Sequence, residues 1–165
     1  MTVLVSAQLM EETWRAVGAL SEREIRKRQA LCGKEQEELT GFVLGYTSDL
    51  PEEALGLALY AHFVVVEAFR RSGATFLKIE SGKIERTWKD NFGFINDLRA
   101  TGYTRSPLQL QEGVSSEPAV MQYVIDALTE ENSDDPVPLI DQDFWRVLQV
   151  LKTVTDCMHE AGRIK

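Results

Sequence analysis

PEEALGLALYAHFVVVEAFRRS, residues 51–72, is the stretch of this chain that decides its fold. It contains 13 consecutive residues, 54–66, that carry no charge. Projected as a helix at about 100° per residue, its charged side chains fall in one sector, and well over half of the circumference is apolar or small. A helix with so wide an apolar face must be covered by neighbours on several sides. We therefore expect it to be the central helix of a helical domain.

Both ends of this predicted helix are indicated by the residue types found there. Pro51 is tolerated in a first turn, and the two glutamates at 52–53 suit the positive end of the helix dipole. The two arginines at 70–71 suit the negative end, and Gly73 can adopt the left-handed conformation that follows a helix. Because a membrane-spanning helix needs about 20 apolar residues, we do not expect this shorter run to cross a bilayer.

Apolar residues spaced three and four apart predict five further helices, with intervening segments that read as loops. The predicted helices cover residues 6–32, 34–46, 80–101, 117–131 and 141–161. In the first, the expected core stripe is Met10, Trp14, Val17 and Leu20; in the helix over 80–101 it is Ile84, Trp88, Phe92, Ile95 and Leu98.

The segments between these helices have the composition of connections. Residues 103–116 and 132–138 are predicted loops, and residues 74–79 are a brief extended piece for which we expect no sheet. The fold prediction is therefore all-α, a single-domain bundle of about six helices around the helix over 51–72.

Length and composition are those of one ordinary folded domain. The chain has 165 residues, of which 44% are hydrophobic and 27% are charged. Its two cysteines, Cys32 and Cys157, form no C-x-x-C motif, so we expect free thiols rather than a disulfide framework or a zinc site. The N-terminus lacks the basic residues of a signal peptide, and we therefore expect a cytoplasmic protein.

The net charge of −8 is unevenly distributed along the chain. Residues 106–145 contain nine acidic residues and no lysine or arginine, so the rest of the chain carries +1. Such an acidic lobe argues against binding to nucleic acid, whose phosphates favour a basic surface. It could attract a basic partner protein, or it could simply keep the protein soluble.

The segment 21–38 has few apolar residues for a helix of its length. It also contains a basic cluster, Arg23, Arg26, Lys27 and Arg28. This cluster is either a solvated helix face or a surface that binds an anion or an acidic partner. We expect a protein partner, or a second copy of the chain, to bind through residues 6–38.

His62 is the most informative polar residue because it lies near the middle of the apolar face of the helix over 51–72. Burial there should lower the pKa of the imidazole and keep it neutral, and its N–H should find a partner. Two interpretations stay open: a hydrogen-bonded core histidine, or a ligand-binding residue that lines a pocket. In the second interpretation, Tyr60 and Glu67 from the polar sector would assist it.

Signatures of catalysis and of metal or cofactor binding are missing from the sequence. It has no Gly-x-Ser-x-Gly turn, no glycine-rich phosphate loop and no Glu-x-x-His pair, although Asp156 and His159 are spaced for one helix face. We therefore predict no catalytic residue, metal ligand or cofactor. The leading hypothesis is a non-enzymatic interaction or adaptor domain with an acidic lobe. The alternative is a helical enzyme or small-ligand-binding protein in which His62 lines an interhelical pocket.

Overall fold

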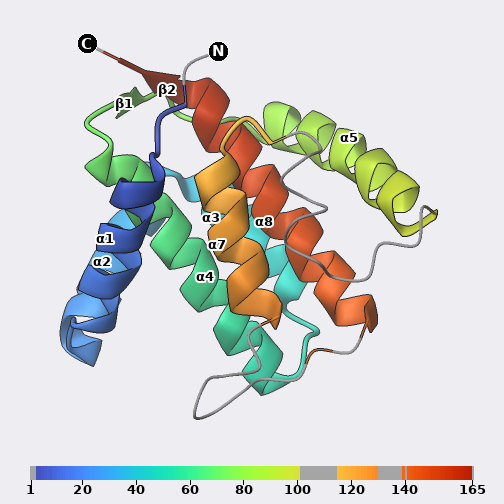
Figure 1. Ribbon diagram of the computed structural model, residues 1–165, viewed down its shortest axis with the longest axis horizontal. Coiled ribbons are helices and arrows are strands. Elements are labelled where there is room, and N and C mark those ends of the chain that lie inside the picture. The colour runs from blue at the N-terminus through green and yellow to red at the C-terminus, as the bar shows by residue number, and fades with distance from the viewer. Residues whose placement is uncertain (1–2, 101–114, 130–138, 140, 165) are drawn as a thin grey trace.

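The computed structural model describes residues 3–100, 115–129, 139 and 141–164, and these confirm the predicted all-α bundle. The helices in this part of the chain are α1 (Ala7–Gly18), α2 (Glu22–Glu35), α3 (Glu37–Thr47), α4 (Glu52–Arg71), α5 (Ser81–Ala100), α7 (Pro118–Thr129) and α8 (Asp141–Ala161). Figure 1 shows α4, α7 and α8 side by side, with α1 and α2 on one flank and α5 on the other.

Helix α4 is the predicted central helix, and its bounds agree with the sequence prediction to one residue at each end. Helices α1, α3, α7 and α8 pack against it. Its alanines at 58 and 61 are fully buried, which lets these neighbours approach closely. Gly73 follows the helix with a φ of 82°, the left-handed conformation that its sequence position predicts.

Helix α8 shares the centre of the bundle with α4, because it is buried along nearly its whole length. The hydroxyls of Thr153 and Thr155 are buried there but donate to the carbonyls of Gln149 and Leu151, each at 2.8 Å. Polar residues can therefore occupy this core helix without leaving an unsatisfied group.

The prediction of one helix over residues 6–32 was wrong, since the chain forms two helices there. Helix α1 ends at Gly18, and α2 starts at Glu22 after Ser21, whose hydroxyl accepts a hydrogen bond from the Glu24 amide at 3.2 Å. The Ser21 hydroxyl also donates to the Glu24 carboxylate at 3.1 Å, so both residues hold the first turn of α2. Helix α2 then runs through Gly33 to Glu35, so α3 begins later than predicted.

The core stripe predicted for α5 was also wrong at one position. Phe92 is 56% exposed, whereas its neighbour Asn91 is buried. The side-chain amide of Asn91 donates to Thr153 Oγ1 at 3.1 Å and to Asp156 Oδ2 at 3.2 Å, both on α8. These hydrogen bonds make Asn91 a better partner for α8 than Phe92. Helix α5 therefore turns Asn91, and not Phe92, toward α8.

A minimal sheet is present, contrary to expectation. Strands β1 (Thr75–Phe76) and β2 (Gly162–Arg163) are antiparallel, with Thr75 opposite Arg163 and Phe76 opposite Gly162. A Cβ atom on Gly162 would lie 2.5 Å from Leu4 Cδ1, so glycine permits the close approach of the N-terminal segment here.

No helix in the described part of the chain is both long and apolar enough to cross a membrane. The predicted loop over 132–138 lies outside the described residues, as does the predicted loop over 103–116 except for its last two residues.

Candidate functional site

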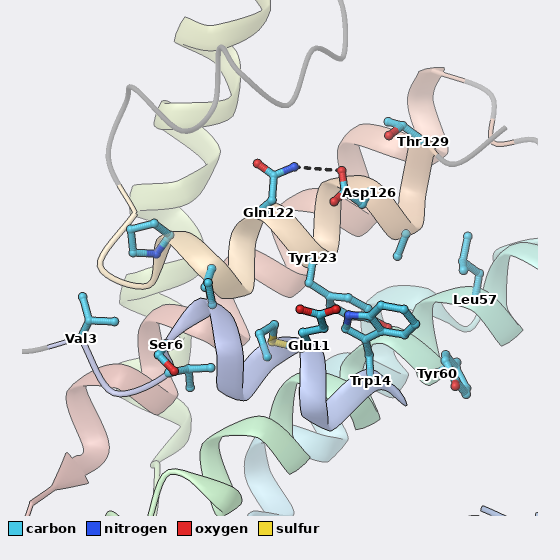
Figure 2. A pocket seen from close by; sticks show the side chains of 16 residues that line it. Val3, Ser6, Glu11, Trp14, Leu57, Tyr60, Gln122, Tyr123, Asp126 and Thr129 are labelled. Atoms are coloured by element: carbon cyan, nitrogen blue, oxygen red, sulfur yellow. Dashed lines mark hydrogen bonds between the residues drawn. The ribbon is translucent and has the colours of Figure 1, made fainter. Parts of the chain in front are cut away.

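A groove with a volume of about 1050 Å³ lies between α1 and α7, beside the first half of α4. We call it the α1–α7 groove. Figure 2 shows Trp14 and Tyr123 between the α1 and α7 ribbons, with Leu57 and Tyr60 beside them on α4. Trp14 is 43% exposed and Tyr60 is 38% exposed. Much aromatic surface therefore remains accessible at this concave site.

The groove exists because α1 turns only a narrow face toward the core. Met10, Thr13 and Val17 of α1 are buried, but Trp14, which the sequence places in the same stripe, lies at the edge of that face. On the opposite wall, the small side chain of Ala119 contributes to the lining. A narrow contact face on one wall and a small side chain on the other leave space between the two helices.

The rim of the α1–α7 groove carries acidic side chains on both walls. Glu11 lies on α1 and Asp126 on α7, and the described lining residues include no lysine or arginine. Gln122 donates to Asp126 Oδ1 at 2.9 Å (Figure 2). Glu11 pairs with Arg15 at 2.8 Å, and the Arg15 guanidinium lies 5.5 Å from the centroid of the Trp14 ring. With Arg15 counted, the two carboxylates still leave the rim with a net negative charge.

The N-terminal segment closes one end of the groove, and the buried carboxylate of Glu117 holds it in place. Oε1 of Glu117 accepts from the Leu4 amide at 2.7 Å and from the Val5 amide at 3.0 Å. Oε2 lies 3.4 Å from His159 Nδ1, although the two atoms do not meet hydrogen-bond geometry. No local sequence pattern indicates this anchor, because its partners are more than 100 residues apart.

His62 lies in the interior of the bundle and is only 7% exposed. Neither ring nitrogen has a hydrogen-bond partner in the described part of the chain, so the expected partner is not found there. Burial lowers the pKa of His62 to about 4, which keeps the imidazole neutral at pH 7. The residues that line the α1–α7 groove do not include it. Its role in a pocket stays a prediction.

Glu67, expected in a polar sector, is only 4% exposed, and three arginine side chains, one of them from α2, lie against its carboxylate. Its Oε1 accepts from Arg28 Nη1 at 2.7 Å and from Arg71 Nε at 3.4 Å, and its Oε2 accepts from Arg70 Nη1 at 3.0 Å. We call these three side chains the arginine cluster. Arg28 is 39 residues from Glu67 in sequence, so local patterns could not reveal the contact.

The three predicted site residues therefore occupy three different environments. Tyr60 lines the α1–α7 groove, His62 is in the interior, and Glu67 is beneath the arginine cluster. No single pocket among those described brings them together.

A buried polar network joins α5 to α8, and Asp156 is its only member that the sequence had suggested as a candidate ligand. Lys152 Nζ donates to Asn91 Oδ1 and to Asp156 Oδ2, each at 2.8 Å, and lies 4.8 Å from the centroid of the Phe94 ring. Each polar side chain in this network has a hydrogen-bond partner. The network therefore accounts for the packing of α5 against α8 and does not by itself indicate a catalytic site.

The thiols and the possible metal ligands offer no reactive centre in the described residues. Cys32 and Cys157 are free and buried, and burial raises the pKa of Cys157 to about 11, so its thiol is protonated at pH 7. Within the described ranges, no three His, Cys, Asp or Glu side chains gather as metal ligands. A second hollow, of about 580 Å³, lies between α3, α5 and α8 and is lined by Trp88, Phe92 and Arg146 among others.

Comparisons of the chain with known proteins found no significant similarity. No protein-family model matches the chain, and neither curated proteins nor solved structures gave a significant match. Functional inference therefore rests on the geometry alone.

Proposed function

We propose that this protein is a non-enzymatic interaction domain whose α1–α7 groove binds an apolar segment of a partner protein that also carries basic residues. The observation that carries this proposal is the exposure of Trp14 and Tyr60 at a concave apolar surface. Folded proteins seldom leave large contiguous apolar patches in contact with water unless another molecule covers them.

The shape of the groove supports a peptide as its occupant. Its volume of about 1050 Å³ is slightly above the range for small-molecule pockets, about 300–1000 Å³. Its two walls are helices, and an amphipathic helix commonly docks between such walls through apolar residues on one face. Tryptophan and tyrosine are also the residue types that most often dominate binding energy at protein interfaces.

The charge of the rim supports basic residues in the partner. Glu11 and Asp126 lie on opposite walls, so lysine or arginine on either side of an apolar segment would meet a carboxylate. Acidic peptides would be repelled by the same two groups. The rim therefore predicts selectivity by charge as well as by shape.

Selection from a random peptide library tests this proposal. We expect the wild-type protein to enrich peptides with apolar residues spaced three and four apart and flanking lysine or arginine. Trp14→Ala should weaken binding of these peptides at least tenfold, measured by fluorescence anisotropy, because it removes the largest exposed aromatic side chain of the groove.

Phe92→Ala is the matched control, since Phe92 is an exposed aromatic side chain on α5, outside the groove. It should leave peptide affinity unchanged. Enrichment of acidic peptides, or equal effects of the two substitutions, would contradict the proposal. Self-association through residues 6–38 is the competing prediction: a dimer of the wild-type protein that becomes a monomer in Trp14→Ala would favour a second copy as the occupant.

A further inference from the structure

The arginine cluster brings more positive charge to Glu67 than its carboxylate can neutralise. Three guanidinium groups lie within 3.4 Å of one buried carboxylate. In the described part of the chain, one further acid lies within 4 Å of these arginines: Glu35, which is half exposed and 3.9 Å from Arg70 Nε. With both carboxylates counted, one positive charge remains in excess. This surplus is notable in a chain whose net charge is −8.

A purely structural role would require fewer arginines. One guanidinium suffices to pair a buried carboxylate, and each added cation is repelled by the others. Arg70 and Arg71 follow Glu67 by three and four residues on the same helix, and both remain about a third exposed. Either side chain could extend into water at little cost, yet both turn toward Glu67. Arg28 reaches the same carboxylate from α2.

The arrangement also leaves hydrogen-bond donors available. A guanidinium has five N–H groups. Among the described residues, Arg28 uses only Nη1 and Arg71 only Nε in hydrogen bonds, so both Nη groups of Arg71 stay available. Because Glu67 is buried beneath the arginines, it holds their planes in place without exposing its own negative charge to a ligand. Such pre-organisation lowers the entropic cost of binding an anion.

We propose that the arginine cluster is a binding site for a phosphoryl group, either free or attached to a protein side chain. A phosphoryl group carries about −1.5 to −2 charges at pH 7, which is more than enough to offset the one excess positive charge, and its three oxygens match the paired N–H donors of guanidinium groups. A carboxylate could offset the same excess charge, but it offers only two acceptor oxygens and so satisfies fewer of the available donors. The site is separate from the α1–α7 groove and does not depend on the function proposed for that groove.

Phosphate binding to the whole chain tests this inference. The probes are inorganic phosphate and a tripeptide with phosphoserine between two alanines, with the unphosphorylated tripeptide as the negative control. Isothermal titration calorimetry should show saturable binding of both phosphorylated probes. Similar affinities would indicate recognition of the phosphoryl group alone, whereas tighter binding of the peptide would indicate a phosphorylated side chain as the ligand.

Lysine substitutions separate this site from a merely structural network, because they keep each positive charge and therefore the pairing with Glu67. Arg28→Lys and Arg71→Lys should each weaken phosphate binding about tenfold, since lysine lacks the paired donors of arginine. Arg26→Lys is the matched control on α2, where Arg26 pairs with the exposed Glu22. It should leave the affinity unchanged, as should Trp14→Ala in the groove.

Two results would overturn the inference. One is the absence of saturable phosphate binding by the folded wild-type protein. The other is a loss of affinity in Arg26→Lys equal to that in Arg28→Lys, which would show a diffuse effect of surface charge. Circular dichroism of each variant would verify that it is folded.

Discussion

Glu67 and Glu117 are both buried carboxylates, but their partners differ in kind. Glu117 accepts hydrogen bonds from the neutral backbone amides of Leu4 and Val5, with His159 nearby. Glu67 accepts from three charged side chains. The comparison shows that neutral donors can satisfy a buried carboxylate in this fold. The cations around Glu67 therefore exceed what burial alone demands.

The two sites also differ in how easily their partners could return to water. The Val5 amide belongs to a residue that is fully buried, whereas the arginines around Glu67 are each about a third exposed. Loss of the Glu117 carboxylate would thus leave a buried backbone amide without an acceptor. Loss of the Glu67 carboxylate would leave cations that are only partly buried and can be hydrated. Substitution of each buried group would measure this difference as a change in stability.

Glu117→Ala should destabilise the protein by about 3 kcal/mol, because it leaves buried amides of the N-terminal segment without an acceptor. Urea denaturation would measure the loss of stability. Hydrogen exchange at the Leu4 and Val5 amides should accelerate as well. Glu12→Ala, at an exposed position on α1, should have little effect. Equal effects of the two substitutions would show that Glu117 is no anchor.

His62 is a third buried polar residue, and it has no hydrogen-bond partner among the described residues. Its pKa is about 4 in the folded protein and about 6.5 in the unfolded chain, so the unfolded chain binds more protons between these values. Stability should therefore fall as the pH falls from about 6.5 to 4.

His62→Leu removes this proton uptake. The stability of the variant relative to wild type should rise by up to about 3 kcal/mol between pH 7 and pH 4, at about 1.4 kcal/mol for each pKa unit. Denaturation at a series of pH values would measure it. If the stability difference between His62→Leu and the wild type stays constant with pH, His62 is hydrated or paired in solution. That result would support the interpretation that His62 lines a pocket.

Glu67→Ala should cost only about 1 kcal/mol, because the arginines released from the carboxylate can extend into water. The loss should shrink in 1 M salt, which screens the repulsion among the freed cations. Urea denaturation at two salt concentrations would test both points. A cost as large as that of Glu117→Ala would remove the distinction between the two carboxylates.

The fold class and the extent of the two central helices could be predicted from the amino-acid sequence alone. The bounds of α4 were predicted to one residue at each end and those of α8 without error, and Gly73 has the expected left-handed backbone. These features depend on apolar periodicity and on residue types at helix ends, which act within a few residues. The Ser21 N-cap was equally local, although the prediction of one long helix overlooked it.

The packing of distant segments sets which polar residues are buried and where a surface stays open, and the sequence patterns did not reveal it. The burial of Glu67 depends on α2 and that of Glu117 on the N-terminal segment, while Asn91 displaces Phe92 from the core through partners on α8. The α1–α7 groove arises from the spacing of two helices more than 100 residues apart. Periodicity within one helix gives the direction of each side chain but not what covers it, because covering requires contacts between distant segments.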